Sequence, residues 1–573
     1  MGLHTSTEIY LFGGLFTSQF NSFSLYQEIG NHHHLEIAFR TDEFEKLLKE
    51  KETSSLFGEK ISIKIVDDVS NQILEFVGCI TQVNKTKTDQ SGSGDEIIII
   101  AKSPTIFADN GPDYKSFIEK SPSEIVEAVL GNFSELKTKI SNYPNKLPYS
   151  VQHNESAFQY VCRLGAQYGQ WCYYDGSKFI FGNPTSGDTA VKLHYQYDLL
   201  EFNYTESPQP TEFTYSTYDI STKKNLSSSN SFGDGALKAN DLRDANTNLW
   251  INEPTGRGNL GDVVKIQAEA LAINQVRFTG SSTNPTLLLG MKVQPTGTGD
   301  ADGKGEIEGT FRIIKISHSC NEIGNYQNQF EAVSTKYSAY PYTNVLSYPV
   351  SQNQIGQVIQ THEDPDSLGR IQVRLSYHDG FEPIWMRMLT PHPGNKHGIF
   401  FLPEVGDEVL VGFEGNNAEH PYVMGCLYNG KDKPPHEPDD KNTLKTIKTR
   451  SGLRIEFNDE DKIFTIETPA KNTIVLDEKE KSITIADQNK NTITMDASGI
   501  TIDSCKDLIL EATGDVKITA KMNIELKATA DANVSALNIA HKANAAFSAK
   551  GGATAELSGS ATTTIKGAMV MIN

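Results

Sequence analysis

The stretch that decides the fold spans residues 500–526 and reads ITIDSCKDLILEATGDVKITAKMNIEL. Short apolar couplets begin at Ile500, Leu508, Val516 and Ile524, which are spaced by eight residues. Because side chains alternate between the two faces of a strand, most of these couplets give one apolar and one polar face. A fixed period of short strands is typical of a repeat architecture.

The same pattern starts near Ser451, with looser steps of seven to eleven residues. The earlier couplets are Ile455-Glu-Phe457, Ile463-Phe-Thr-Ile466, Ile474-Val-Leu476, Ile483-Thr-Ile485 and Ile493-Thr-Met495. A repeat of this size cannot bury its apolar face alone, and large residues are few. We therefore expect residues 451–573 to form a β-helical rod that closes by winding several chains together.

The composition limits the classes of partner. The chain has 573 residues, a net charge of −20, 38% hydrophobic and 22% charged residues. This length corresponds to about four domains of a soluble protein. Phosphate binding requires basic clusters, so the acidic balance argues against a nucleic-acid partner or an anionic membrane.

The cysteines and the N-terminus indicate the cellular compartment in which the protein is made. Six scattered cysteines without a C-x-x-C motif predict reduced core residues rather than disulfides or a zinc site. The first twenty residues lack a basic start and a continuous apolar run, so no signal peptide is expected. No apolar run reaches the ~18 residues of a membrane span. We expect synthesis in the cytoplasm and, if the protein acts outside, export without a cleaved signal.

The first half of the chain predicts β-structure around a small α+β insertion. Residues 1–105 alternate as strands of a first β-barrel or sandwich, with a short helical pattern at Phe44–Leu48. Residues 106–189 contain a helix start with a capping box at Ser121 and a second helix that ends at Gly169. Aromatic strands then flank an Asp175-Gly176 turn, which predicts a hairpin.

The third segment, residues 190–345, is expected to form a second β-barrel. Its strand patterns at 290–293, 311–316 and 328–334 repeat the order and spacing of those at 61–65, 76–83 and 96–103. This repetition indicates a degenerate duplication, with chance similarity between strands as the alternative. Five Gly- and Pro-punctuated strands in residues 351–430 suit an OB-fold, and the charged, Pro-rich residues 431–450 suit a linker.

The candidate catalytic and ligand-binding residues do not match any known sequence motif. The tract His32-His33-His34 predicts solvated surface more readily than a metal site. Residues 297–305 superficially resemble a phosphate loop, but the spacing is wrong and no helix pattern follows. His392, His397 and His420 share a domain with two acidic residues, Glu404 and Asp407, but no metal-binding motif organises them. We expect no catalytic site, no cofactor and no bound metal, and hence a non-enzyme.

Three stretches of the chain carry a family signature. The first is Glu155–Trp171, a helix followed by an aromatic strand. The second combines Asp364–Val373, Leu402–Val411 and Pro421–Asn429. The third is the terminal Ile565–Asn573. Together they resemble the VgrG family, the spike proteins of type VI secretion systems, and the related hub-spike proteins of contractile phage tails; the resemblance covers essentially the whole chain, and the middle block is its most specific part.

This resemblance implies a mainly β homotrimer with two hub β-barrels, an α+β insertion, an OB-fold collar and an intertwined, triple-stranded β-helix needle. It implies a membrane-puncturing spike at the tip of a contractile injection machine. The expected partners are an Hcp-like inner tube protein, baseplate components, effectors or their adaptors, a PAAR-type tip protein and, transiently, the target membrane. The expected tip-binding residues are Lys566, Gly567, Ala568, Met569, Val570, Met571, Ile572 and Asn573.

Two absences refine the expectation. Only about 20 residues separate the OB segment from the rod, which is too few for a lysozyme domain there. The sequence stops at Asn573, so no appended effector domain is expected. The alternatives are a spike of an extracellular injection particle or phage tail, a tail-associated cell-wall hydrolase, and a host-recognition fibre.

Overall fold

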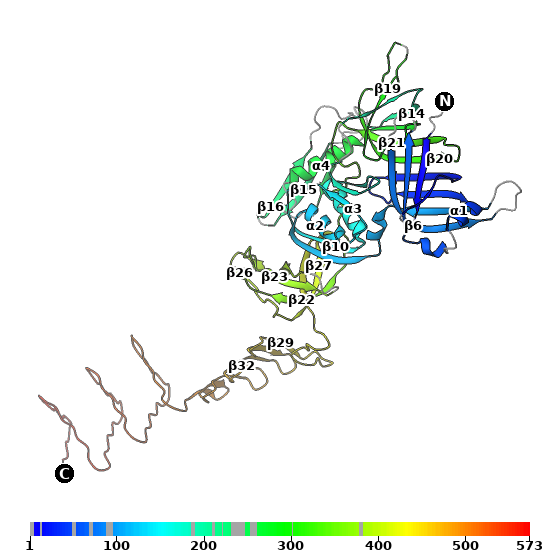
Figure 1. Ribbon diagram of the computed structural model, residues 1–573. Helices are drawn as coiled ribbons and strands as arrows, with labels where there is room; N and C mark the ends of the chain where they lie inside the picture. The colour runs from blue at the N-terminus through cyan, green and yellow to red at the C-terminus, as the bar shows by residue number, and fades with distance from the viewer. Residues whose placement is uncertain are drawn as a thin grey trace. The chain divides into compact units, whose positions relative to one another are not determined.

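The computed structural model describes residues 5–11, 14–48, 53–67, 73–87, 95–184, 189–208, 212–220, 222–230, 247–251, 260–300, 302–376 and 382–572. It divides into two compact units, Met1–Pro434 and Pro435–Asn573. The chain is mainly β, as the sequence predicts (Figure 1). Because the two units are separate, each is described by itself.

A thirteen-stranded sheet forms the largest part of the first unit. Its strands alternate buried and more exposed residues, as in β1 and β5, because one face covers the core. The main path runs β14-β18-β21-β20-β3-β4-β7-β6-β5-β1-β2, and β13 and β19 join beside β20. The bounds are β1 Thr5–Leu11, β2 Leu15–Thr17, β3 Ser22–Glu28, β4 His34–Arg40, β5 Lys60–Asp67, β6 Ile73–Thr86, β7 Glu96–Lys102, β13 Val191–His194, β14 Leu199–Glu206, β18 Val276–Ser282, β19 Lys292–Thr296, β20 Phe311–Asn321 and β21 Tyr326–Ser334.

The pairing order within this sheet repeats. One half pairs in the order β5, β6, β7, β4, β3, and the other pairs in the order β19, β20, β21, β18, β14. The duplicated sequence patterns fall on corresponding strands, which supports the predicted duplication. The two halves share one sheet rather than forming separate sheets, because β3 pairs antiparallel with β20 through Lys315↔Glu28 to Asn321↔Ser22.

Helices and small sheets pack with this large sheet around one apolar core (Figure 1). The helix α2 begins after Ser121 with the expected capping box, and α3 ends at Gly169, whose φ of 66° is left-handed. The hairpin β11–β12 surrounds the expected Asp175-Gly176 turn. The bounds are α1 Thr41–Leu48, η1 Thr53–Leu56, η2 Pro104–Ala108, β8 Asp113–Lys120, α2 Pro122–Leu130, β9 Thr138–Ile140, β10 Leu147–Glu155, α3 Ala157–Tyr168, β11 Trp171–Tyr174 and β12 Phe179–Gly182.

The helix α4, Leu260–Ile273, corrects the expectation that residues 190–345 are β throughout. Its buried Val264 and Ala268 are four residues apart, so they lie on the same face of the helix. Three of its residues pack in a small separate core beside a three-stranded sheet. The strands of that sheet are β15 Phe213–Asp219, β16 Lys224–Ser229 and β17 Thr247–Trp250.

A closed five-stranded barrel confirms the predicted OB-fold. Its order is β22-β23-β24-β28-β27, and it encloses an apolar core of its own. Val151 of β10 belongs to that core, so the barrel packs directly on the α+β insertion. The bounds are β22 Gln354–Gln360, β23 Ile371–Leu375, β24 Ile384–Met388, β25 Pro393–Gly394, β26 His397–Gly398, β27 Glu408–Phe413, η3 Glu414–Asn416 and β28 Pro421–Cys426.

The second unit contains a meander of seven short strands, each antiparallel to the next. Its first strand lies inside the stretch expected to be a linker. From Ser504 to Ile572, no helix or strand is present within the single chain. The bounds are β29 Leu444–Lys448, β30 Arg454–Asn458, β31 Ile463–Glu467, β32 Thr473–Asp477, β33 Ser482–Ala486, β34 Thr492–Asp496 and β35 Gly499–Asp503.

Candidate assembly surface

The meander of the second unit places its apolar couplets on one face. Since Ile474 and Leu476 are two residues apart on β32, their side chains lie on the same side of the sheet. Cross-strand pairing extends each of them into a row along the meander. The first row is Ile455, Ile466, Ile474, Ile485, Ile493 and Ile502, and the second row is Phe457, Phe464, Leu476, Ile483, Met495 and Ile500. We call these two rows the apolar face.

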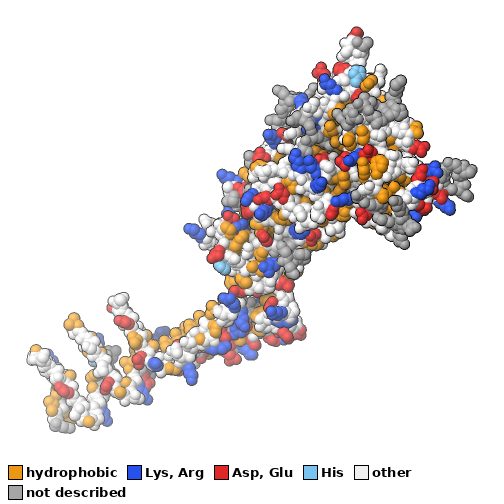
Figure 2. Space-filling view, viewed as in Figure 1, with side chains coloured by type: hydrophobic (Ala, Val, Ile, Leu, Met, Phe, Trp, Pro, Cys, Tyr) orange, Lys and Arg blue, Asp and Glu red, His pale blue; other side chains and the backbone are white. Residues whose placement is uncertain are grey.

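The apolar face remains accessible in the single chain. Ile474 is 38% exposed and Ile485 is 41% exposed, and exposure rises to 69% at Ile500. Figure 2 shows hydrophobic side chains along one side of this segment and charged side chains along the other. A contiguous exposed apolar surface of this extent marks an interaction surface, because a soluble chain gains free energy by covering it.

The opposite face of the meander is polar at its centre. Cross-strand pairs there join Thr465, Val475, Thr484, Thr494 and Thr501. β-Branched residues favour strands whichever face they occupy. The threonines therefore stabilise the strands while leaving the apolar face as the one surface of the meander suited to burial.

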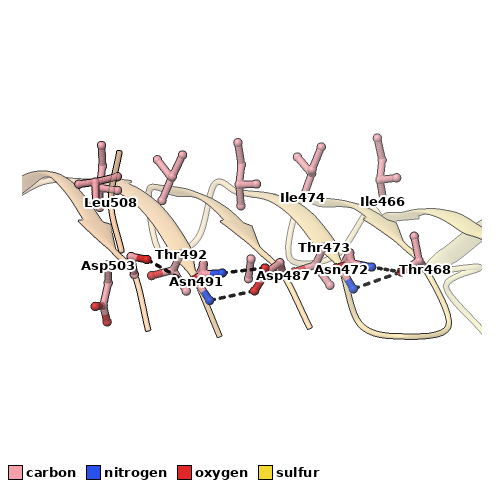
Figure 3. A pocket seen from close by; sticks show the side chains of 15 residues that line it. Ile466, Thr468, Asn472, Thr473, Ile474, Asp487, Asn491, Thr492, Asp503 and Leu508 are labelled. Carbon is pink, nitrogen blue, oxygen red and sulfur yellow. Dashed lines mark hydrogen bonds between the residues drawn. The ribbon is translucent and has the colours of Figure 1, made fainter. Parts of the chain in front are cut away.

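An open groove of about 500 Å³ runs along the first row of the apolar face (Figure 3). Ile466, Ile474 and Leu508 point into the groove from one side. Polar side chains of the turns, including Asn472 and Asn491, line the other side. Leu508 belongs to the chain that follows the last strand, so the groove continues beyond the meander.

Two asparagines connect successive turns along this edge. Asn472 Oδ1 accepts a hydrogen bond from the Gln488 amide at 3.0 Å. Asn491 Oδ1 accepts one from the Cys505 amide at 2.9 Å, and its Nδ2 donates to Asp487 Oδ2 at 2.8 Å. That side-chain donation is the main cause of the lowered pKa of Asp487. These bonds link consecutive turns of the meander.

Ion pairs connect the turns along the opposite edge. Lys479 Nζ lies 3.1 Å from Asp461 Oδ1, and Lys462 Nζ lies 3.6 Å from Glu478 Oε1. All four side chains are solvent-exposed, so water and salt screen each pair and it contributes little to stability. This edge of the meander is therefore charged, in contrast to the apolar face.

The segment with the strict eight-residue period follows the meander. Its couplets at Leu508, Val516 and Ile524 are respectively 57%, 60% and 55% exposed. No strand is formed there within the described single chain. Backbone N–H and C=O groups that lack partners in an extended chain are a template for pairing with another chain. The backbone groups of residues 508–526 are therefore available for pairing with another chain.

The expected tip-binding residues lie in the same extended segment. Met569 and Met571 are each 79% exposed, Val570 is 49% exposed and Ile572 is 86% exposed. Asn573 lies outside the described residues. Tip binding by residues 566–573 stays a prediction.

The histidine tract is not solvated surface, contrary to the expectation. His33 is fully buried beside Gln27, and His32 Nε2 lies 3.1 Å from Asp109 Oδ2. His33 directly precedes the mostly buried strand β4. Its burial lowers its pKa to about 3. Among the described residues, no three His, Cys, Asp or Glu side chains gather as a metal site.

The remaining sequence candidates are dispersed. The rings of His392 and His397 meet edge to face, with 5.6 Å between their centroids. Asp407 Oδ2 accepts a hydrogen bond from the Glu404 amide at 2.8 Å. Residue 301 of the suspected phosphate loop lies outside the described residues, and its neighbours Asp300 and Lys304 form a backbone turn. Asp300 Oδ1 accepts from the Lys304 amide at 2.8 Å, which is loop geometry.

The cysteine prediction was half right. All six cysteines are free, and Cys79, Cys172 and Cys320 are buried as expected. Cys426 and Cys505 are exposed in the single chain, contrary to the core assignment. Across the described residues, no helix combines the length and the apolar character needed to cross a membrane.

Family models match two parts of the first unit. The model of a phage tail baseplate hub matches residues 46–323. The model of a type VI secretion system and phage-baseplate injector OB domain matches residues 354–428, which include the closed barrel. The first match therefore runs from β5 to β20 and includes the α+β insertion, and the second covers the OB-fold.

Curated relatives are spike proteins of Pseudomonas aeruginosa. VgrG5 is 32% identical over 140 residues, which are 22% of this chain and 17% of the relative. VgrG1a is 22% identical over 396 residues, which are 61% of this chain and 59% of the relative. The chain thus spans less than two thirds of the length of these relatives.

Solved structures share the fold. The Escherichia coli c3393 protein, a type VI secretion component described as similar to bacteriophage T4 tail proteins, has a TM-score of 0.50 at 15% identity; the match covers 71% of this chain and 97% of that one. A chain of the Francisella PdpA–VgrG complex has a TM-score of 0.53 at 9% identity and covers 87% of this chain and 80% of that one. With a hub model, an injector OB model and VgrG relatives all matching, the chain belongs to the VgrG family of type VI secretion spike proteins, which are related to phage tail hub-spike proteins.

Proposed function

We propose that three copies of this chain form the membrane-puncturing spike at the tip of a contractile injection machine. In this proposal the apolar faces of the three chains meet along a common axis, and residues 504–572 wind into a triple-stranded β-helix. Sheath contraction supplies the work, and the needle transmits it. The chain itself has a mechanical role and no catalytic one.

The observation that carries this proposal is the contrast between the meander and the segment after it. The meander satisfies its backbone groups by pairing within the chain, yet Ile474 and its row are left accessible. Residues 504–572 are extended and form no strand within the chain. Winding three copies together would cover the apolar rows and pair the extended segments at once.

The same arrangement explains the mechanical resistance that a spike needs. Chains that are wound together must be disentangled before they unfold, so their resistance is kinetic. The exposed ion pairs along the turns, such as Lys479 with Asp461, keep the outside of the needle soluble. The membrane contact is thus brief and driven by force rather than by affinity.

The proposed partners follow from the proposed position. The duplicated halves of the large sheet, taken three times, would give six similar units that dock on an Hcp-like inner tube within the baseplate. A PAAR-type tip protein would cap residues 566–573, and effectors or their adaptors would travel on the assembly. The protein would be made in the cytoplasm and leave it through the machine.

Native mass determination of the full-length protein tests the assembly. We expect a species of three times 63.2 kDa that appears as a tapered particle by electron microscopy. A monodisperse monomer at micromolar concentration would overturn the proposal. Sheath and tube genes beside this gene would distinguish a secretion system from a phage tail or an extracellular particle.

A cell-wall hydrolase is the second candidate from the sequence, and no specific observation in the structure favours it. The exposed carboxylates of the turns pair with lysines, as Asp461 does with Lys479. Incubation of purified protein with peptidoglycan should release no soluble fragments.

A further inference from the structure

Two cysteines from different elements of the first unit, helix α3 and strand β11, are in contact. Cys162 lies on α3 and Cys172 on β11, and their Sγ atoms are 3.4 Å apart. Both are free thiols in the structure. Cys172 is fully buried, whereas Cys162 is half-buried. One residue of the pair is thus fully buried and the other is only partly buried.

Glycines bring the helix and the strand into this contact. Gly169 ends α3 in the left-handed region, with φ of 66°, so the chain turns back and runs along the helix. Gly165 lies one turn after Cys162, and a Cβ atom there would come within 3.0 Å of the Cys172 Cβ. The local backbone is therefore arranged for a close approach of these two residues.

A third segment fixes both cysteines. The Gly30 amide donates a hydrogen bond to the Cys172 carbonyl at 2.7 Å, and the Cys162 thiol lies 3.6 Å from the Gly30 carbonyl oxygen. Gly30 follows β3, the strand that joins the two halves of the large sheet. The pair is held in place from three directions, which favours reaction between the two thiols over reaction with distant ones.

We propose that Cys162 and Cys172 form a reversible redox pair that closes to an intramolecular disulfide. A disulfide requires an S–S distance of about 2.05 Å, so the two Sγ atoms must approach each other from their present separation of 3.4 Å. Cys162 is the less buried of the two residues and is therefore the one that reacts first, while burial and the neighbouring Cys162 raise the pKa of Cys172. The oxidant is a small-molecule or protein disulfide.

The reaction balances in two exchange steps. The Cys162 thiol loses its proton, and the thiolate attacks the oxidant's disulfide to form a mixed disulfide while one oxidant thiolate leaves. The Cys172 thiol then loses its proton and attacks Cys162 Sγ, which displaces the second oxidant thiolate. Two thiols of the protein are oxidised, the oxidant's disulfide is reduced to two thiols, and the two protons pass to the thiolates.

The disulfide would tie α3 to β11 beside the contact between the first unit's insertion and the OB-fold. The neighbouring Arg163 and Gln167 on α3 both hydrogen-bond to Glu419 of the OB-fold. In the proposed function the protein leaves a reducing cytoplasm for an oxidising space, where disulfides persist. The pair would then be a dithiol during assembly and a disulfide after delivery; this timing rests on the proposed function, whereas the chemistry does not.

The test uses full-length protein in which the exposed cysteines are removed as Cys426→Ser and Cys505→Ser. The protein is incubated with oxidised glutathione, denatured and alkylated, and its mass and peptides are measured. We expect loss of two of the four remaining thiols, a peptide that joins residues 162 and 172, and recovery of both thiols with dithiothreitol. The oxidised protein should also show slower amide exchange along α3.

Matched variants separate this pair from the other buried thiols. Cys320→Ala in the same background should still lose two thiols, whereas Cys162→Ala should lose none. Four alkylated thiols after oxidation, or a glutathione adduct on Cys162 without a crosslinked peptide, would overturn the proposal. Because the unmodified pair is itself assayed, a poorly folded variant does not leave the question open. A positive result with a monomeric protein would sustain the redox pair while rejecting the spike.

Discussion

Arg163 of α3 and Glu419 of the OB-fold form a buried ion pair, with Nη1 and Oε1 3.5 Å apart. Their side chains are 8% and 4% exposed. Glu155 completes the set, 2.7 Å from Arg163 Nη2. Ser150 Oγ donates a further hydrogen bond to Glu419 Oε1 at 2.9 Å. A charged network with most of its groups satisfied therefore joins the α+β insertion to the OB-fold.

Replacing Arg163 with methionine should destabilise the first unit strongly. The substitution retains volume but leaves Glu155 and Glu419 buried without their cation, which costs about 3 kcal/mol. All three tryptophans precede the second unit, so fluorescence during denaturant unfolding of the full chain reports on the first unit. The control Arg387→Met breaks a solvent-exposed pair with Glu414 and should cost less than about 1 kcal/mol. Equal losses from both variants would contradict the assignment.

Acidification below pH 6.5 should weaken the first unit before its carboxylates titrate. Burial lowers the pKa of His33 and of His318 to about 3. Above pH 6.5 both states of each histidine are neutral, so stability is unaffected by them. As the pH falls from 6.5 toward 3, the two histidines bind protons in the unfolded chain but not in the folded one. The free energy of unfolding therefore decreases. At pH 5 each histidine should cost about 2 kcal/mol.

The variant His318→Asn tests this pH dependence. His318 Nε2 donates to Gln27 Oε1 at 3.1 Å, and its Nδ1 accepts from the Tyr326 hydroxyl at 2.6 Å. The variant removes the titrating group, so its unfolding midpoint should fall less between pH 7.5 and pH 5 than the wild-type midpoint does. A parallel fall in both proteins would refute the role of His318.

A lysine on the apolar face should prevent assembly, while one on the opposite face should not. Ile485 and Thr484 are adjacent on β33 and point to opposite sides of the meander. Ile485→Lys would place a charge in the proposed shared interior, where an unpaired charge is costly. Light scattering should show loss of the threefold mass for Ile485→Lys and its retention for Thr484→Lys. A trimer with Ile485→Lys would argue against burial of this face.

An asparagine that hydrogen-bonds to the next turn should stabilise the meander more than one that bonds only within its own turn. Asn491 bonds across to the Cys505 amide, whereas Asn489 Nδ2 bonds only within its own turn, to Asp487 at 3.0 Å. Asn491→Ala should destabilise the junction after β35 by about 1 kcal/mol. Hydrogen exchange at the Cys505 amide should rise several-fold in that variant and stay unchanged in Asn489→Ala. Unaltered exchange in both would show that the bond is dispensable.

Deletion of residues 566–573 should abolish capture of a PAAR-type tip protein without changing the oligomeric mass. The segment is exposed in the single chain and lies at the end of the repeat pattern. Co-purification with a candidate tip protein measures the first effect, and native mass measures the second. Tip binding that survives the deletion would place the binding residues elsewhere.

Local patterns predicted much of the fold because the decisive interactions are local. The capping box at Ser121 and the left-handed turn at Gly169 fix helix ends with residues a few positions apart. The Asp175-Gly176 turn likewise fixes its hairpin. The OB-fold could be predicted from five strands separated by Gly and Pro, because the number and spacing of the strands determine how the barrel closes.

Other features depend on contacts that sequence spacing does not contain. His33 is buried because β4 lies within the large sheet, beside Gln27 of β3. The helix α4 was missed because small residues such as Ala268 and Ala270 give a weak apolar stripe. The two rows of the apolar face could be predicted from alternation in each couplet, but the register that aligns Ile474 with Ile485 is set by the turns.

The pairing of β3 with β20 also governs the order in which the protein can be completed during translation. The Glu28 and Lys315 that pair there are separated by almost three hundred residues. At ribosomal rates of about 5–20 residues per second, β20 is synthesised on the order of 15–60 s after β3. The edge of β3 is unpaired during that time. An unpaired edge strand invites association with other nascent chains. Polysomes carrying several copies of this chain thus face a defined interval during which chaperone occupancy, rather than final stability, sets the yield.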